Sequence, residues 1–311
     1  MARLSAGLRP RLVLAGVGVV LALLAAAVLV IASGDDTQAP TAPTDPPGTL
    51  PRSTSSVPAS IDVTAQAIVY RTDQAVGGRF RVKLTNTGDD EFTVTGVRLE
   101  SAGFETLAFT PHETLYSPSE RTDLITPFGD VRCEPGDALD PTDAAISFVT
   151  ASGSEGEVRV PLESIYEAIP KLYERECDKA FIEESAVIAI TDPIEESGEG
   201  FDARARATLR ITRAGSDEAI AVDDIRGSVL YSITGELPAM LAAGEDQIDI
   251  PIELRGTRCD GHALGETKQP FVYPIRLRIG DDFESSYDIP VNPSQRDQLW
   301  TFLVSRTCRL E

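Results

Sequence analysis

The arrangement of hydrophobic and polar positions predicts β-strands over most of the chain beyond residue 60. Apolar side chains fall on every second position in Phe80–Leu84 and, with one shift of register, in Phe92–Leu99, which is the period of a half-buried strand. Between them, Asn86–Asp90 supplies the Asn, Gly and Asp residues typical of a tight turn. We therefore expect a β-hairpin here. Further strands are expected near 61–70, 122–133, 144–150 and 156–162.

Helical spacing is limited to two short segments. Ser164 with Glu167 three residues later fits a capping box, although Pro170 predicts that the helix after it is short or kinked. Near the end, Asn292–Gln295 offers an N-cap, a proline at the first helical position and a glutamine at the third. The apolar residues expected to pack this second helix on the sheet are Leu299, Trp300, Phe302 and Leu303. Because no long helical pattern interrupts the strands, an antiparallel β-sandwich is favoured over an α/β fold.

The two halves of this region share a pattern. Three landmarks recur in the same order and at nearly one offset: Val82–Glu91 with Leu209–Glu218, Cys133 with Cys259, and Cys177 with Cys308. Since such agreement is hard to obtain by chance, we interpret the region as one module used twice. The expected fold is all-β, with two tandem immunoglobulin-like antiparallel β-sandwich modules at 61–180 and 181–311, each with a short C-terminal helix and one disulfide.

The start of the chain has the pattern of a membrane anchor. Residues 12–33 contain an uninterrupted uncharged run, Leu12–Ala32, that is long enough to cross a bilayer as a helix. Arginines precede the run and two acids follow it, so the positive-inside rule places residues 1–11 in the cytoplasm and the rest outside. We expect an uncleaved, single-pass transmembrane signal anchor in the cell membrane. Cleavage near Val30–Ala32 is the alternative.

The segment that follows the anchor is expected to be a spacer. Residues 34–60 are rich in Pro, Thr, Ser and Asp and show no apolar periodicity. Such a segment cannot bury enough apolar surface to offset its ordering entropy, so we expect a disordered linker biased towards polyproline II. Glycosylation of its Ser and Thr residues stays open, because only composition suggests it.

The charge of the chain restricts its partners. The formal net charge is −21, with 42% hydrophobic and only 6% aromatic residues. A surface this acidic repels nucleic acid and anionic lipid headgroups. It suits a well-hydrated domain outside the cell, so no nucleic acid partner is expected.

All four cysteines are expected in disulfides, because an even number of cysteines outside the membrane is typical of stapled domains. The simplest pairing lies within each module, Cys133 with Cys177 and Cys259 with Cys308. Loops of this length imply at most about 4 kcal/mol of stabilisation per bridge. Zinc is disfavoured, since the cysteines lack the short spacing of a zinc finger and His112 and His262 are the only histidines. No cofactor is expected.

The chain lacks the common catalytic motifs. It has no nucleophile elbow, zinc-protease helix, phosphate-binding loop or dinucleotide fingerprint, and no catalytic residue is assigned. The second module has a polar loop that the first lacks, with His262 beside Asp260, Glu266 and Lys268. We treat these four residues as a candidate ligand loop. An unrecognised hydrolase that uses His262 is one alternative, whereas a loop whose polar groups satisfy one another is the simpler interpretation.

Paired acids at predicted turns raise a Ca²⁺-dependent adhesion module as another alternative. These acidic runs are Asp89–Glu91, which has three acids, and the pairs Asp217–Glu218, Asp223–Asp224 and Asp281–Asp282. None has the Asp-x-Asp-x-Asp-Gly spacing of a dedicated calcium loop, and Asp is an ordinary turn residue. Solvated turns are therefore the preferred interpretation, and no metal site is assigned.

Arg258–Lys268, together with Phe271 and Pro274–Leu277, resembles a stretch in secreted or membrane-anchored actinobacterial proteins that carry Arg-Cys-Asp-x-His-Ala. The first module matches weakly, because Glu134 replaces the aspartate and the histidine and lysine are missing. The resemblance implies a location in the envelope and no particular activity. We expect a non-enzymatic, membrane-anchored binding or scaffolding protein whose partner is another envelope protein or a cell-wall component. The sequence leaves the oligomeric state open.

Overall fold

The computed structural model describes residues 59–133, 139 and 142–310, all of which belong to one compact unit, Ser56–Glu311. The expected cytoplasmic tail (1–11), the anchor (12–33) and nearly all of the linker (34–60) lie outside the described residues. Among the residues described, no helix is both long enough and apolar enough to span a membrane. Of the described residues, 48% lie in strands and 21% in helices, which confirms the expected all-β sandwich class.

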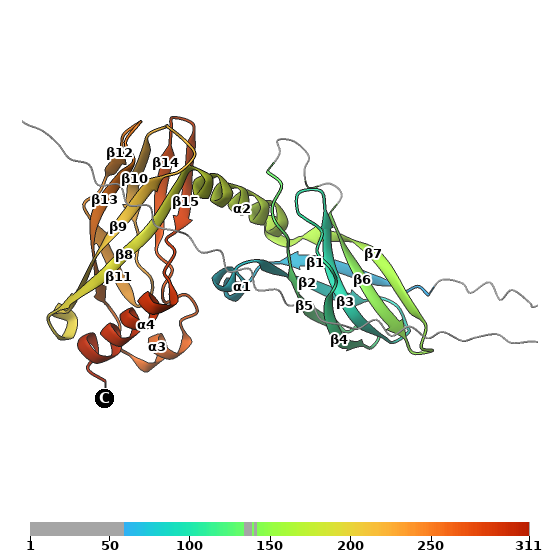
Figure 1. Ribbon diagram of the computed structural model, residues 1–311. Helices are drawn as coiled ribbons and strands as arrows, with labels where there is room; N and C mark the ends of the chain where they lie inside the picture. The colour runs from blue at the N-terminus through green and yellow to red at the C-terminus, as the bar shows by residue number, and fades with distance from the viewer. Residues whose placement is uncertain (1–58, 134–138, 140–141, 311) are drawn as a thin grey trace, which may run out of the picture. The chain divides into compact units, whose positions relative to one another are not determined.

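The described strands fall into two groups (Figure 1), and each group surrounds its own hydrophobic core. We call the elements around the first core, built from residues between 59 and 173, the first sandwich. Those around the second core, built from residues between 182 and 308, are the second sandwich. Both cores consist mainly of Val, Ile, Leu and Ala, with a few buried aromatic rings.

The strands of the first sandwich are hydrogen-bonded into one continuous seven-stranded sheet. Its elements are β1 (Val63–Ile68), α1 (Arg71–Val76), β2 (Arg79–Asn86), β3 (Phe92–Ser101), β4 (Thr110–Tyr116), β5 (Arg121–Pro127), β6 (Thr142–Thr150) and β7 (Glu155–Ser164). The order is β4-β3-β6-β7-β1-β2-β5, and β1 and β7 form its parallel pair. The two edge strands approach each other, since Nε2 of His112 on β4 lies 3.1 Å from the Ile125 carbonyl oxygen on β5.

β2 and β3 are strands, as predicted, but they do not form the predicted hairpin. β2 pairs with β1 and β5, whereas β3 pairs with β4 and β6. Phe80 and Leu84 on β2 and Phe92 and Val97 on β3 are buried in the same core, so the turn carries the chain across the core. Apolar alternation specifies which face of a strand is buried and not which strand lies beside it. The hairpin prediction was therefore wrong.

The helix predicted after Ser164 is longer than expected. A short 3₁₀ segment, η1 (Ile165–Glu167), leads into α2 (Ala168–Ser185), and no side-chain capping bond from Ser164 forms at η1. Pro170 does not shorten α2 because it lies in the first turn, where its missing N–H has no partner to lose. Residues of α2 enter both cores: Ile169 and Leu172 the first, and Ile182 the second.

The second sandwich consists of two four-stranded sheets. Its elements are β8 (Ala186–Ser197), η2 (Gly200–Asp202), β9 (Arg204–Arg213), β10 (Ile220–Ile225), β11 (Tyr231–Gly235), β12 (Ala239–Leu241), β13 (Gln247–Gly256), α3 (Gly261–Glu266), β14 (Pro274–Ile279), β15 (Phe283–Asp288), α4 (Pro293–Thr301) and η3 (Phe302–Thr307). The sheet orders are β12-β10-β14-β15 and β11-β13-β9-β8. The strand order β4-β3-β6-β7 in the first sandwich matches the order β12-β10-β14-β15 in the second. The order β1-β2-β5 likewise matches β8-β9-β13.

α4 begins as the sequence predicts. Oδ1 of Asn292 accepts a hydrogen bond from the Gln295 backbone N–H at 2.9 Å, and Oε1 of Gln295 accepts one from the Asn292 N–H at 3.1 Å, which is a complete capping box. Trp300, by contrast, is 39% exposed. The expectation that it packs on the sheet was wrong, because a single face of the helix reaches the core. The residues on that face are Leu299, Phe302 and Leu303.

Candidate functional site

Both expected disulfides are present. Cys133 bonds to Cys177, 44 residues away, and Cys259 bonds to Cys308, 49 residues away, with Cα–Cα distances of 5.5 and 5.3 Å. The first bridge joins the segment after β5 to the middle of α2, and the second joins the segment before α3 to the residue after η3. No free cysteine occurs among the described residues. The four disulfide-bonded cysteines act as structural staples, and none is available as a thiolate nucleophile.

The candidate ligand loop forms α3 and its N-cap. The Asp260 carboxylate accepts a hydrogen bond from the Ala263 backbone N–H at 2.9 Å and pairs with Arg258 at 3.0 Å. The Ala263 hydrogen bond and the Arg258 guanidinium hold the pKa of Asp260 below its ordinary value. Asp260 therefore starts the helix, as N-cap aspartates do, and is not held ready for a ligand.

His262 and Glu266 form an exposed pair one turn apart on α3. Nδ1 of His262 lies 3.1 Å from Oε1 of Glu266, and the two side chains are 73% and 68% exposed. Lys268 follows the helix and is also exposed. A base oriented by a carboxylate supplies two of the three members of a nucleophilic triad, but within the described residues no hydroxyl group contacts His262. The structure thus joins His262 to Glu266 on open surface and assembles no reacting centre around them.

The acidic pairs are dispersed. Asp223 and Asp224 lie on strand β10 and not at the predicted turn. Asp223 accepts a hydrogen bond from Arg278 at 2.6 Å, and this contact lowers its pKa, while Asp224 lies 3.7 Å from Arg226. Over the described part of the chain, no group of three or more His, Cys, Asp or Glu side chains could hold a metal ion.

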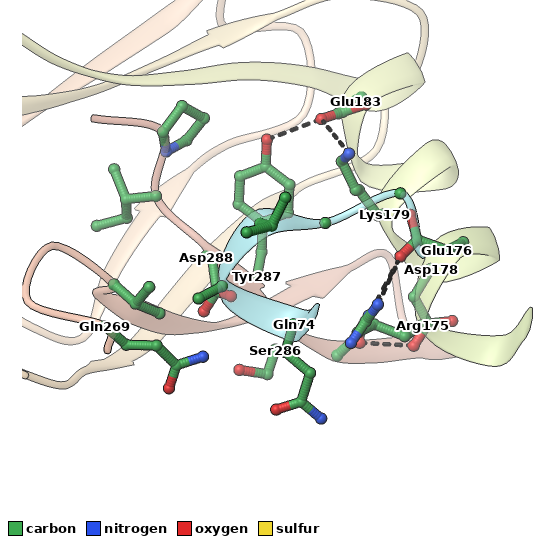
Figure 2. A pocket seen from close by; sticks show the side chains of 18 of the residues that line it. Gln74, Arg175, Glu176, Asp178, Lys179, Glu183, Gln269, Ser286, Tyr287 and Asp288 are labelled. Atoms are coloured by element: carbon green, nitrogen blue, oxygen red, sulfur yellow. Dashed lines mark hydrogen bonds and ion pairs between the residues drawn. The ribbon is translucent and has the colours of Figure 1, made fainter. Parts of the chain in front are cut away.

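A cavity of about 850 Å³ lies beside α2 and β15, and Figure 2 shows its polar wall. The Ser285 hydroxyl donates to Asp178 at 2.6 Å, and the Tyr287 hydroxyl donates to Glu183 at 3.2 Å. Lys179 lies 4.0 Å from Glu183. Burial and the neighbouring Glu183 carboxylate raise the pKa of Tyr287. These contacts fasten α2 to β15 and occupy carboxylates that a cationic ligand would need, so we assign this cavity no ligand.

Sequence reasoning missed the contact between α2 and β15. The rings of Phe181 and Phe283 lie with their centroids 4.5 Å apart, and Ile182, which follows Phe181 in the sequence, is buried. Part of the signal was available, because Phe181 and Ile182 continue the helical spacing beyond Tyr173. The charged residues between these apolar positions resemble a solvated helix face, and their partners on β15 lie about a hundred positions later in the sequence.

Comparison with known proteins identifies no family for this chain. No protein-family model matches it, and no curated protein matches it. Among solved structures it is similar to the YadV chaperone, at 14% identity over 74% of this chain and 99% of that chain (TM-score 0.22). It is also similar to red sea bream transglutaminase, at 8% identity over 75% of this chain and 31% of that chain (TM-score 0.21). The N-terminal region of an enterococcal surface protein matches at 10% identity over 79% and 98% (TM-score 0.19).

Proposed function

We propose that this chain is an extracytoplasmic binding or scaffolding protein of the cell envelope, held to the membrane by its N-terminal segment and without catalytic activity of its own. The observation that carries the proposal is the pair of disulfides, which together use all four cysteines of the chain. Disulfides persist in oxidising compartments and are rare in the cytosol. They therefore support a location outside the cytoplasm.

The N-terminal sequence supports anchoring at that location. The apolar run Leu12–Ala32, with arginines before it and acids after it, fits a single-pass helix with a cytoplasmic N-terminus. Residues 34–60 then act as a spacer between the membrane and the first sandwich. The Arg-Cys-Asp-x-His-Ala stretch at Arg258–Ala263 is in keeping with an actinobacterial envelope protein.

We further propose that the two sandwiches are copies of one immunoglobulin-like module. The matching strand orders support this reading. So does the equivalent position of the bridges: in each sandwich the last strand is followed by a helical segment, and the second cysteine lies within it or directly after it. Modules of this kind have packed cores and present loops, edges and faces to their partners. A duplicated module therefore favours a surface for binding over an enclosed active site.

The side chains with potential chemistry also favour binding over catalysis. His262 has a carboxylate partner on exposed surface, and Asp178 and Glu183 are engaged by hydroxyl groups of β15. The formal net charge of −21 disfavours nucleic acid and anionic membrane surfaces. Another envelope protein or a wall component is the partner that remains.

The proposal is tested with the full chain, epitope-tagged at its C-terminus, in its native cells. We expect it to stay with the membranes after a high-salt wash, to be labelled on intact cells by a membrane-impermeant lysine reagent, and to retain both disulfides on a non-reducing gel. Cross-linking of those cells should give a discrete adduct with an envelope component. Protection from the reagent until the cells are lysed would remove the location, and the absence of any adduct would remove the binding role.

A further inference from the structure

The turn between β7 and α2 holds two consecutive residues in the left-handed region. Tyr166 has φ 54° and ψ 33°, and Glu167 has φ 58° and ψ 39°. This conformation is unfavourable for residues that carry a Cβ atom, and Gly or Asn usually occupies it. Two side-chain contacts hold the turn: the Ser164 hydroxyl accepts from the Ile169 N–H at 2.9 Å, and Lys171 donates to the Tyr166 carbonyl oxygen at 3.1 Å.

The strained turn places an aromatic ring in solvent. Tyr166 is 86% exposed, whereas Tyr116, Tyr231 and Tyr273 are almost fully buried. Because the Tyr166 side chain is so little buried, it contributes almost nothing to the stability of the fold through burial of apolar surface. Local strain of this kind is found at ligand-binding positions more often than elsewhere, and exposed tyrosines supply large, rigid contact areas at protein interfaces.

A cavity of about 350 Å³ opens beside Tyr166, within the first sandwich and the start of α2. Its volume is sufficient for one large side chain. The apolar residues that line it are Ile68, Val69, Ile165, Ala168 and Leu172. Its remaining lining residues besides Tyr166 are Gln74, Lys171 and Arg175. The lining thus has an apolar floor, two cations and no carboxylate, on a chain whose formal net charge is −21.

Lys171 and Arg175 lie one turn apart on α2, so they project from the same helix face. They are 64% and 41% exposed, and each already has a carboxylate nearby, Glu167 at 3.3 Å and Glu176 at 2.8 Å. An ammonium group has three donors and a guanidinium has five. Each cation therefore has an N–H donor left for a further anionic partner and does not have to give up its present one.

We propose that this cavity, with Tyr166 at its side, binds an acidic peptide segment of another protein by inserting one bulky apolar side chain. The apolar side chain occupies the floor, Tyr166 covers it, and flanking Asp or Glu residues meet Lys171 and Arg175. An acidic partner is favoured electrostatically, because the residues that line this cavity include two cations and no carboxylate, on a chain whose formal net charge is −21. Glu167 and Glu176, which pair with the two cations, are not among the lining residues. The inference rests on the proposed binding function and names the surface and the partner chemistry for it.

The test uses a display library of random 12-residue peptides, selected on the full chain in discs of zwitterionic lipid and counter-selected on empty discs. We expect enrichment of peptides with a large apolar residue flanked by Asp or Glu. The strongest peptide should lose at least about tenfold in affinity for Tyr166→Ala and for Lys171→Glu. Phe201→Ala, a change at another exposed aromatic residue (63% exposed), and Lys179→Glu, a charge reversal elsewhere on α2, should leave the affinity unchanged.

A melting temperature equal to that of the unaltered chain is the control that each of the four variants is folded. Enrichment of purely apolar peptides, competition by empty vesicles, self-association of the chain through this face, or no enrichment at all would each overturn the proposal. So would equal affinity of the peptide for Tyr166→Ala and the unaltered chain. If the peptide result fails while the cross-linked adduct still forms in both cavity variants, the binding function stands and this cavity is not its site. Absence of the adduct removes the function itself.

Discussion

The ring of Phe148 on β6 lies over Gly156 on β7, its partner across the antiparallel ladder. A Cβ atom on Gly156 would lie 2.5 Å from Cζ and 3.0 Å from Cε1 of that ring. Phe148 is 1% exposed, and its ring meets Phe92 edge-on at 6.3 Å. Gly156 therefore leaves the space that a large core side chain occupies, in the manner of an aromatic residue that covers a strand glycine.

Substitution Gly156→Ala should destabilise the first sandwich by about 1–3 kcal/mol, because the added methyl group forces a buried ring to move. Chemical denaturation measures the change as a shift of the midpoint. Gly265→Ala is the matched control, since a Cβ atom there meets nothing within 4 Å, and it should change stability by less than about 1 kcal/mol. An unchanged midpoint for Gly156→Ala would contradict the close approach.

Tyr273 and Tyr231 provide a contrast within one core. Their rings lie 6.2 Å apart. The Tyr231 hydroxyl donates to the Leu299 carbonyl oxygen at 2.7 Å, whereas the buried Tyr273 hydroxyl has no hydrogen-bond partner within the part of the chain that the structure describes. Tyr231→Phe should cost about 1 kcal/mol, and Tyr273→Phe should be neutral or stabilising, since it removes an unsatisfied polar group. Thermal or chemical unfolding of the two variants distinguishes them. Equal losses would show that Tyr273 has a partner.

The buried tyrosines also predict how stability depends on alkaline pH. Burial raises the pKa of Tyr116, Tyr231, Tyr273 and Tyr287 above the ordinary value of about 10. A raised pKa means that the folded state holds the proton more tightly than the unfolded state. The resulting stabilisation is therefore complete below about pH 10 and is lost as pH rises further. Tyrosinate absorbance from these groups should appear together with loss of circular dichroism. Ionisation that clearly precedes unfolding would contradict the burial.

The sequence predicted individual elements better than their neighbours. Alternation located β2, β3, β6 and β7, because the period of two follows from the geometry of a half-buried strand. It could not show that β2 and β3 belong to opposite ends of the sheet order, since a turn motif fits a hairpin and a crossing equally. The capping box at Asn292 was predictable because both of its hydrogen bonds are local in the chain.

The functional surfaces were harder to predict. The disulfides followed from cysteine number and an expected compartment, but Tyr166 gave no signal. Left-handed positions are expected at Gly or Asn, and here the sequence has Tyr and Glu. The His262 loop was selected because it is absent from the first module. In the structure its carboxylate Asp260 forms a helix cap, which is a local structural role.

Addition of Ca²⁺ tests the alternative that the chain is a calcium-dependent adhesion module. Because no group of acidic side chains in the described residues could hold a metal ion, excess Ca²⁺ should leave the melting temperature of the full chain unchanged, and EDTA should do the same. A ligand that binds the folded state alone raises the melting temperature, and the rise grows with the logarithm of the ligand concentration above its Kd. A rise with Ca²⁺ that EDTA reverses would restore the adhesion alternative.

The two disulfides should act on different unfolding transitions, because each lies beside its own hydrophobic core. The double variant Cys259→Ser, Cys308→Ser should lose up to about 4 kcal/mol, the chain-entropy value for a loop of this length. Trp300 is the single tryptophan and lies on α4 in the second sandwich, so its fluorescence reports that transition. Cys133→Ser, Cys177→Ser is the matched control and should move the Trp300 midpoint much less. Equal shifts in both variants would show that the two sandwiches unfold as a single cooperative unit.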